Sequence, residues 1–211
     1  MKDEPGRRES ILAAAFAEFA AKGFRGATIK SIAEAAGVQS PALLYWYFTS
    51  KDELFQAVLE AHAPILGAVA ELAPLADESP EMVLEHLGRA YLAMVRGEQE
   101  RRFFRLLLME AIQRPEVARL FLESGPVRVI GFLTEYLTRQ IALGRLRPHD
   151  VRASARAFFG MLIPQLLLAT AFSGYSPDGL TDEEHLRTAI AIFLRGLQPE
   201  GDAAPPTTDE R

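Results

Sequence analysis

The spacing of apolar residues is the feature that most constrains the fold of this chain. Apolar side chains recur three and four positions apart from Ile11 to Leu197, and no stretch shows the sustained every-second-residue alternation of a half-buried strand. Hydrophobic residues make up 49% of the 211 positions, which is enough to bury a sizeable core. The sequence therefore predicts an all-α fold of about nine helices.

Short-range signals place three helices in the first fifty residues. Thr28 and Ser40 are suited to cap helix N-termini, and Pro41 follows Ser40 at the first helical position. Gly23 and Gly37 are placed to end the preceding helices in left-handed turns. We predict a head of three helices over residues 1–51.

A larger helical body is predicted over residues 52–197. Ser50 and Glu53 have capping-box spacing, so a fourth helix is expected from there to about Leu72, kinked at Pro64. Later helices are expected near residues 79–98, 101–113, 116–122, 126–143, 150–172 and 181–197. Residues 198–211, rich in Pro, Asp and Thr, are predicted to form a disordered tail.

Composition excludes several chemistries. The chain has no cysteine, which rules out disulfides, thiolate metal sites and cysteine nucleophiles. The four histidines are scattered singly and none forms an i, i+4 pair, so neither a metal site nor a cofactor is expected. With no long uncharged apolar run and no signal-peptide pattern, we expect a cytoplasmic protein that does not bind membranes.

The two parts of the chain differ in charge. Residues 1–51 hold 7 Lys and Arg against 5 Asp and Glu, whereas residues 52–211 hold 16 against 23. All four lysines lie in the first segment. A small basic head on an acidic body is compatible with phosphate contact at one end.

The second and third predicted helices, joined across residues 37–39, have the arrangement of a helix-turn-helix, whose second helix can lie in the DNA major groove. Tyr45, Trp46 and Tyr47 follow one another, and consecutive helical residues point about 100° apart, so they cannot all be core. We expect Trp46 to brace the head, and Tyr45 and Tyr47 to contact phosphate or bases through their hydroxyls.

The chain resembles the TetR family of repressors over about residues 8–60. The motifs that carry the resemblance are ILAAAF (11–16), KGF (22–24), TIKSIA (28–33), AAGV (35–38) and LYWYFTSK (44–51). The resemblance implies a dimeric, ligand-responsive DNA-binding regulator, by family default a repressor that its ligand releases; activation stays open. The expected DNA partner is a palindromic operator.

Family roles carry over residue by residue. The resemblance implies a phosphate contact for Thr28, a base contact for Lys30 and a phosphate contact for Lys51. The implied contacts of the recognition helix and the residues after it are Gln39, Ser40, Pro41, Ala42, Leu43, Tyr45 and Tyr47. The interval from Gly37 to Phe48 is one residue longer than is common in the family, so which of positions 39, 40, 42 and 43 touches a base stays open.

The last two long helices are the expected homodimer interface. A helix that is apolar around most of its circumference, as over residues 157–172, needs cover on every side, which a second copy would supply. The candidate dimerisation residues are Val151, Ala155, Phe158, Phe159, Leu162, Leu166, Leu186, Ile190, Phe193 and Leu194. Burial inside one protomer is the alternative for these residues.

A pocket for a small apolar or amphipathic effector is expected in the body, where polar groups interrupt apolar stretches. The candidate ligand-binding residues are Tyr91, Met94, Phe103, Phe104, Leu107, Glu110, Phe132, Tyr136, Met161 and Gln165. Plain core packing is the alternative for most of them. Ligand binding would favour one arrangement of the body and move the two heads out of register with the DNA.

A helical-bundle enzyme and a helical adaptor protein are the two alternative functions. A helical-bundle enzyme is disfavoured because the sequence lacks a Glu-x-x-His pair, a phosphate-binding glycine loop and a nucleophile elbow, and no catalytic residue is assigned. A helical adaptor whose helix-turn-helix contacts protein would differ in salt dependence, because DNA binding weakens steeply as salt rises.

Overall fold

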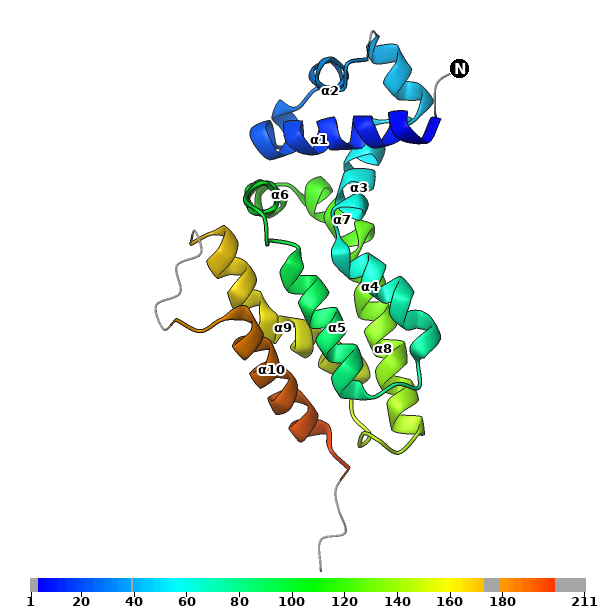
Figure 1. Ribbon diagram of the computed structural model, residues 1–211, viewed down its shortest axis with the longest axis vertical. Helices are drawn as coiled ribbons and strands as arrows, with labels where there is room; N and C mark the ends of the chain where they lie inside the picture. Colours follow the sequence, from blue (N-terminus) through cyan, green and yellow to red (C-terminus); the bar gives the residue numbers. More distant parts are fainter. Residues whose placement is uncertain (1–3, 39, 173–178, 200–211) are drawn as a thin grey trace, which may run out of the picture.

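The computed structural model describes residues 4–38, 40–172 and 179–199 (Figure 1). These ranges contain ten α-helices and two short 3-10 helices, and no strand lies within them. The elements are α1 (Glu4–Gly26), α2 (Ile29–Ala35), η1 (Pro41–Trp46), α3 (Lys51–Ala61), α4 (Pro64–Leu72), η2 (Ala73–Leu75), α5 (Pro80–Ala93), α6 (Glu98–Gln113), α7 (Pro115–Ser124), α8 (Pro126–Ala142), α9 (Val151–Thr170) and α10 (Asp182–Leu197). The all-α prediction is confirmed.

The head consists of α1, α2 and η1 and lies at one end of the molecule (Figure 1). Gly37 follows α2 with a φ of 64°, in line with the left-handed turn predicted for it. Gly23 breaks α1 with a φ of 70° but a ψ of 176°, so it has the positive φ that favours glycine and an extended ψ rather than a left-handed turn. Ile11, Phe19 and Ile32 are fully or almost fully buried in the head core. The third helix is a 3-10 helix rather than the expected α-helix.

The fourth predicted helix is two helices. It breaks at His62 and Ala63, and α3 makes an angle of 64° with the segment from Pro64 to Leu75. Because the ring of Pro64 leaves no N–H to donate and excludes the preceding turn, the kink becomes a full break. The next helix is also shorter than predicted, since α5 ends at Ala93 and α6 already begins at Glu98.

The body has its own core, built mainly by α4, α5, α8, α9 and α10 (Figure 1). Leu84, Leu133 and Phe158 are completely buried there. Helices α6 and α7 lie between this bundle and the head, where α6 packs on α1 and α7 packs on α3. The buried residues of α1, α2, α3, α6 and α7 form one continuous cluster, so the head is packed onto the body rather than tethered to it.

Helix α9 is apolar and 20 residues long, which by length and composition alone would suit a membrane span. Its Phe158 and Leu162 side chains are fully buried, as expected of a core helix. The predicted disordered tail lies, from residue 200 onward, outside the described residues.

Candidate DNA-binding surface and internal cavity

Local caps fix the elements that would face DNA. The Thr28 hydroxyl accepts a hydrogen bond from the backbone N–H of Ser31 at 3.0 Å, while the Ser31 hydroxyl accepts one from the N–H of Thr28. Ser40 accepts from the N–H of Ala42 at 3.2 Å, with Pro41 at the first helical position. These caps hold α2 and η1 by contacts within a few residues.

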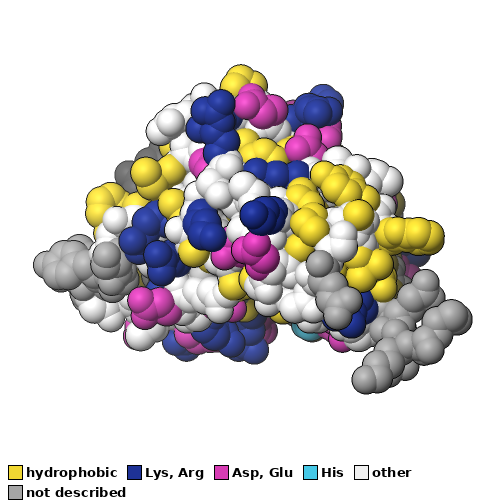
Figure 2. Space-filling view, turned by 90° about the horizontal axis from the view of Figure 1, so that it is seen from above, with side chains coloured by type: hydrophobic (Ala, Val, Ile, Leu, Met, Phe, Trp, Pro, Cys, Tyr) yellow, Lys and Arg dark blue, Asp and Glu magenta, His cyan; other side chains and the backbone are white. Residues whose placement is uncertain are grey.

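The outer face of η1 exposes large side chains. Leu44 is buried and anchors η1 to the head core, whereas Tyr45 is 54% exposed and Trp46 is 85% exposed. The expectation that Trp46 braces the head is therefore wrong: Leu44 supplies the anchor, and Trp46 points to solvent. Figure 2, which looks down on this end, shows apolar and basic side chains interspersed rather than one continuous basic patch.

The other candidate DNA contacts fall into two groups. Thr28, Ser40, Pro41, Ala42 and Leu43 are exposed, and so is Lys30, which lies 4.0 Å from Glu34. Tyr47 is half-buried and packs against the head core, so its ring is used partly for packing. Gln39 lies outside the described residues.

Lys51 is partly buried, unlike a lysine whose side chain is fully exposed to solvent. Its Nζ lies 4.5 Å from the centre of the Phe24 ring, and burial lowers the pKa of the ammonium, although the carboxylate of Glu110 acts in the opposite direction. The residue stands at the first position of α3, where backbone N–H groups are unpaired within the helix. A phosphate contact would thus combine the side chain with the helix N-terminus.

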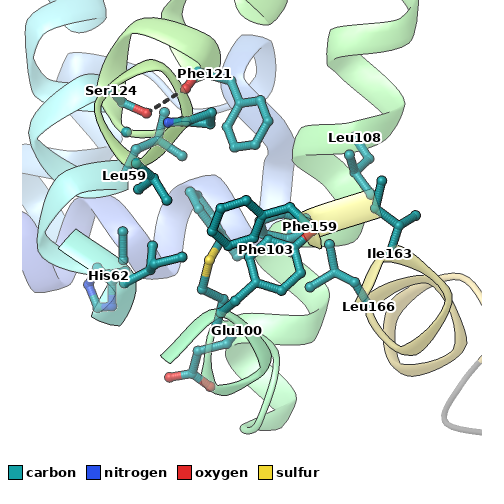
Figure 3. A pocket seen from close by; sticks show the side chains of 18 of the residues that line it. Leu59, His62, Glu100, Phe103, Leu108, Phe121, Ser124, Phe159, Ile163 and Leu166 are labelled. Carbon is teal, nitrogen blue, oxygen red and sulfur yellow. Dashed lines mark hydrogen bonds between the residues drawn. The ribbon is translucent and has the colours of Figure 1, made fainter. Parts of the chain in front are cut away.

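A cavity of about 320 Å³ lies where head and body meet. It is lined by Phe16, Leu59, His62, Ala63, Ile65, Tyr91, Met94, Glu100, Phe103, Phe104, Leu108, Phe121, Ser124, Gly125, Pro126, Val129, Ile130, Phe159, Ile163, Leu166 and Leu167. The walls are overwhelmingly apolar and rich in aromatic rings (Figure 3). A site of this size and character is typical of a small-molecule pocket.

Four of the ten candidate ligand-binding residues line this cavity: Tyr91, Met94, Phe103 and Phe104. The structure places the other six elsewhere, namely Leu107, Glu110, Phe132, Tyr136, Met161 and Gln165. Helical spacing shows which side chains are apolar but not which side of the helix faces a void, and this ambiguity accounts for the difference between the candidate set and the cavity lining.

The polar candidates outside the cavity hold the fold together. The Tyr136 hydroxyl donates to the carbonyl of Glu78 at 2.8 Å, and the Gln165 amide donates to Asp182 at 3.0 Å. Met161 is a partly buried residue of the body core. The Tyr136 and Gln165 side chains thus join α8 and α9 to other segments of the body.

Glu110 lies at the joint between α6 and the head. One of its carboxylate oxygens is 3.5 Å from the backbone nitrogen of Arg25 and fills the space that a side chain at Gly23 would need. Its other oxygen is buried without a hydrogen-bond partner among the described residues, next to a void of about 10 Å³, roughly the room needed by one water molecule. Glu110 therefore ties the body to the α1–α2 turn.

The cavity-lining residues that sequence analysis missed include two that join the head to the body. Phe16 of α1 and His62 at the end of α3 stack with ring centroids 3.7 Å apart and planes 10° apart. Phe16 reads in the sequence as one more core residue of the first helix, and His62 as an isolated histidine. The packing of α1 against α6 and of α3 against α1 and α7 brings them to the pocket.

The candidate dimerisation residues form the inner face of α9 and α10. Nine of the ten are buried within the protomer, and Val151 is partly buried, so they belong to its own core as the alternative proposed. Phe159 and Leu166 also line the cavity. The outer face of the pair is exposed instead, with Ala157, Gly160 and Pro164 on α9 and Ile192 on α10.

The fold and the two sites define a helix-turn-helix regulator: a compact head with an exposed recognition element, packed on a helical body that encloses an apolar cavity. Residues 11–58 match the model of the bacterial regulatory proteins of the tetR family, and residues 82–197 match that of the AefR-like transcriptional repressor C-terminal domain. The chain belongs to the TetR family of transcriptional regulators.

Individual proteins agree with this assignment. The HTH-type transcriptional regulator SrpR of Pseudomonas putida is 28% identical over 188 residues, which cover 89% of this chain and 81% of SrpR. A TetR-family regulator from Mesorhizobium loti has the same fold, with a TM-score of 0.71, 24% identity and coverage of 94% of this chain and 100% of that one. The flavonoid-responsive regulator FrrA gives a TM-score of 0.67 at 27% identity, over 93% and 99% of the two chains.

Proposed function

We propose that this regulator is a homodimeric repressor that binds a palindromic operator and leaves it when a small apolar or amphipathic effector enters the cavity. The effector would occupy the space between head and body, and the protein would act in the cytoplasm, where its DNA lies. TetR-family regulators bind operators, dimerise and bind small-molecule effectors, and FrrA is described as flavonoid-responsive.

One observation carries the proposal: a helix of the DNA-binding head contributes a side chain to the lining of the cavity. Phe16 belongs to α1 of the head and lines the cavity, and His62 stacks on it from the end of α3. An effector that displaces either ring therefore acts directly on the helix that supports α2 and η1. Binding that prefers one position of α1 shifts the population of head orientations.

The proposed DNA contacts lie at the far end of the head. Thr28 and Lys30 at the start of α2 and Tyr45 and Trp46 on η1 are exposed together there. Side chains on a short helix that enters the major groove reach base edges, and hydroxyls at a helix N-terminus reach phosphate. Trp46 joins the set because its ring is free to lie against the DNA backbone.

The outer face of α9 and α10 is the proposed dimer contact. Ala157, Gly160 and Pro164 are small or compact, which lets two helices approach closely, and Ile192 adds an exposed apolar side chain. A two-fold contact would place two heads on half-sites about 34–36 Å apart, or at a multiple of that spacing.

Selection of bound duplexes from a random DNA pool tests the proposal. We expect palindromic or near-palindromic sites, bound by a dimer with an affinity that falls steeply as salt rises. Trp46→Ala should weaken operator binding, whereas Leu122→Ala, an equally simple truncation of an exposed residue on α7, should not. A monomer in solution, or no duplex recovered at low salt, would overturn the proposal.

Residue roles are tested on the selected operator. Lys30→Ala should alter base preference, whereas Lys51→Ala should weaken all sequences about equally. If both variants leave duplex affinity unchanged, the assigned DNA contacts are wrong.

A further inference from the structure

The polar groups of the cavity are few and unevenly charged. Only four lining residues carry a polar side chain, namely His62, Tyr91, Glu100 and Ser124, and Glu100 is the only one with a full formal charge at neutral pH. No lysine or arginine is among the described residues that line the cavity. An anionic ligand group would thus enter an apolar space with no cation to meet it.

Two of the four polar groups bring no charge to the cavity. The Ser124 hydroxyl donates its proton to the carbonyl of Phe121 at 2.7 Å. Burial raises the pKa of the Tyr91 phenol to about 12, so the phenol stays neutral. Charge pairing with a ligand's polar end therefore falls to Glu100, with His62 beside it.

Glu100 and His62 lie on the same side of the aromatic cluster (Figure 3). Glu100 is half-buried on the first turn of α6 and folds back against Gly97. It makes no ion pair among the described residues. Burial lowers the pKa of His62, which favours the neutral ring, although nearby Glu100 acts in the opposite direction.

Aromatic rings line the cavity on one side of this polar end, and the Glu100 carboxylate is turned away from them, toward Gly97 (Figure 3). Phe103 follows Glu100 by one helical turn on α6, and its ring centre is 4.9 Å from that of Phe16, which in turn stacks on His62. A carboxylate beside aromatic faces is the combination that stabilises a cationic nitrogen in a largely desolvated place, through charge pairing and cation–π attraction. The same combination repels a carboxylate.

We propose that the effector is an apolar compound bearing one positively charged nitrogen, held by Glu100 with its apolar part against the aromatic walls, and that carboxylate-bearing amphiphiles are rejected. This inference rests on the proposed function, since it specifies the ligand of the same cavity. His62, as a neutral ring, supplies a second acceptor for an N–H of the ligand.

The test compares three probes of nearly equal shape: phenylbutylamine, phenylbutanol and phenylbutyrate. Binding to the full-length protein is measured by calorimetry near neutral pH, and release of the selected operator is followed by fluorescence anisotropy. We expect the amine to bind at least about tenfold more tightly than the carboxylate, with the alcohol between them, because a hydrogen bond to a charged group is worth roughly this much or more.

Glu100→Gln should weaken amine binding about tenfold and leave alcohol binding unchanged. The matched control is Glu98→Gln, two positions away on the same first turn but outside the cavity, which should change neither. Thermal unfolding of both variants verifies that the fold is kept.

The outcomes separate the two proposals. If all three probes bind alike and release the operator, the cavity is the effector site but the preference for a cation is wrong. An amine affinity that Glu100→Gln leaves unchanged also overturns the inference. If none of the probes binds or releases the operator, the inference fails, while selection of palindromic duplexes still decides separately whether the protein is a DNA-binding regulator.

Discussion

The head and the body differ in how far apart in the sequence the partners of their polar contacts lie. In the head, Thr28 caps α2 through Ser31, three residues away, and Ser50 caps α3 through Glu53, also three residues away. In the body, Tyr136 donates to the carbonyl of Glu78, 58 residues earlier. Polar contacts between segments far apart in the sequence are thus concentrated in the body, which also has local caps such as those at Ser79 and Thr181.

The second difference concerns packing. The head core contains aromatic contacts such as that between Phe19 and Phe24, whose ring centres are 6.1 Å apart, whereas the space between head and body holds the cavity of about 320 Å³. A close-packed core holds the surface residues above it in one geometry, whereas helices around a cavity can shift relative to one another. The molecule therefore separates a rigid reading element from an adaptable sensing element.

The largest effect that this comparison predicts is in the body. Gln140 is completely buried, donates to the carbonyl of Ala76 at 2.8 Å and accepts from Arg145 at 3.1 Å. Gln140→Leu keeps nearly the same side-chain volume but removes the hydrogen bonds to Ala76 and Arg145. The free energy of unfolding should therefore fall by about 2–4 kcal/mol. Urea denaturation followed by circular dichroism measures the change.

Thr138→Val is the matched control for this variant. Thr138 is exposed and bonds only to the carbonyl of Thr134 in its own helix, so its replacement should change stability by no more than about 0.5 kcal/mol. Equal losses for the two variants would show that the long-range contacts of Gln140 contribute no more to stability than a local hydrogen bond within α8.

The same difference in reach explains what the sequence could predict. The caps at Thr28, Ser40 and Thr181 and the positive φ of Gly23 and Gly37 each depend on a few adjacent residues, and all are present in the structure. The break at Pro64 was expected only as a kink, because the loss of helix there depends on how α4 packs in the body.

The cavity and the free surfaces could not be read from the sequence in this way. Phe103 and Leu107 lie one turn apart on α6 and look equivalent, yet only Phe103 lines the cavity of about 320 Å³. Phe158 and Ile192 both appear as apolar positions of long helices, yet one is core and the other is 62% exposed. Which side of a helix faces core, void or solvent depends on its neighbours in space.

A smaller effect is predicted in the head. Thr28→Ala removes the hydroxyl that caps α2 and should cost about 1 kcal/mol of local stability, with about a fivefold loss of operator affinity. Amide hydrogen exchange in α2 measures the first and fluorescence anisotropy the second. The urea transition of the body should not change.

Two variants show how Thr28 acts. Thr28→Ser keeps a capping hydroxyl and should bind the operator nearly as well as the unmodified protein. Ser31→Ala removes the other half of the capping box without touching a phosphate-facing group. If Ser31→Ala weakens operator binding as much as Thr28→Ala does, Thr28 acts as a cap alone and its proposed phosphate contact is wrong.

The smallest predicted effect lies between the two regions, at His62. Burial against Phe16 lowers the pKa of this histidine, so the unfolded chain takes up its proton at a higher pH than the folded protein does. Stability should therefore fall as the pH drops below about 6.5, the ordinary histidine value, and stay level above it.

His62→Phe isolates this contribution, because phenylalanine keeps a ring against Phe16 and does not titrate. Free energies of unfolding measured at several pH values between neutral and mildly acidic should decline less in the variant than in the unmodified protein. If stability declines equally in the variant and the unmodified protein, the site of His62 beside Phe16 tolerates a charged imidazole. In that case protonation next to Glu100 would leave the joint between the two regions intact.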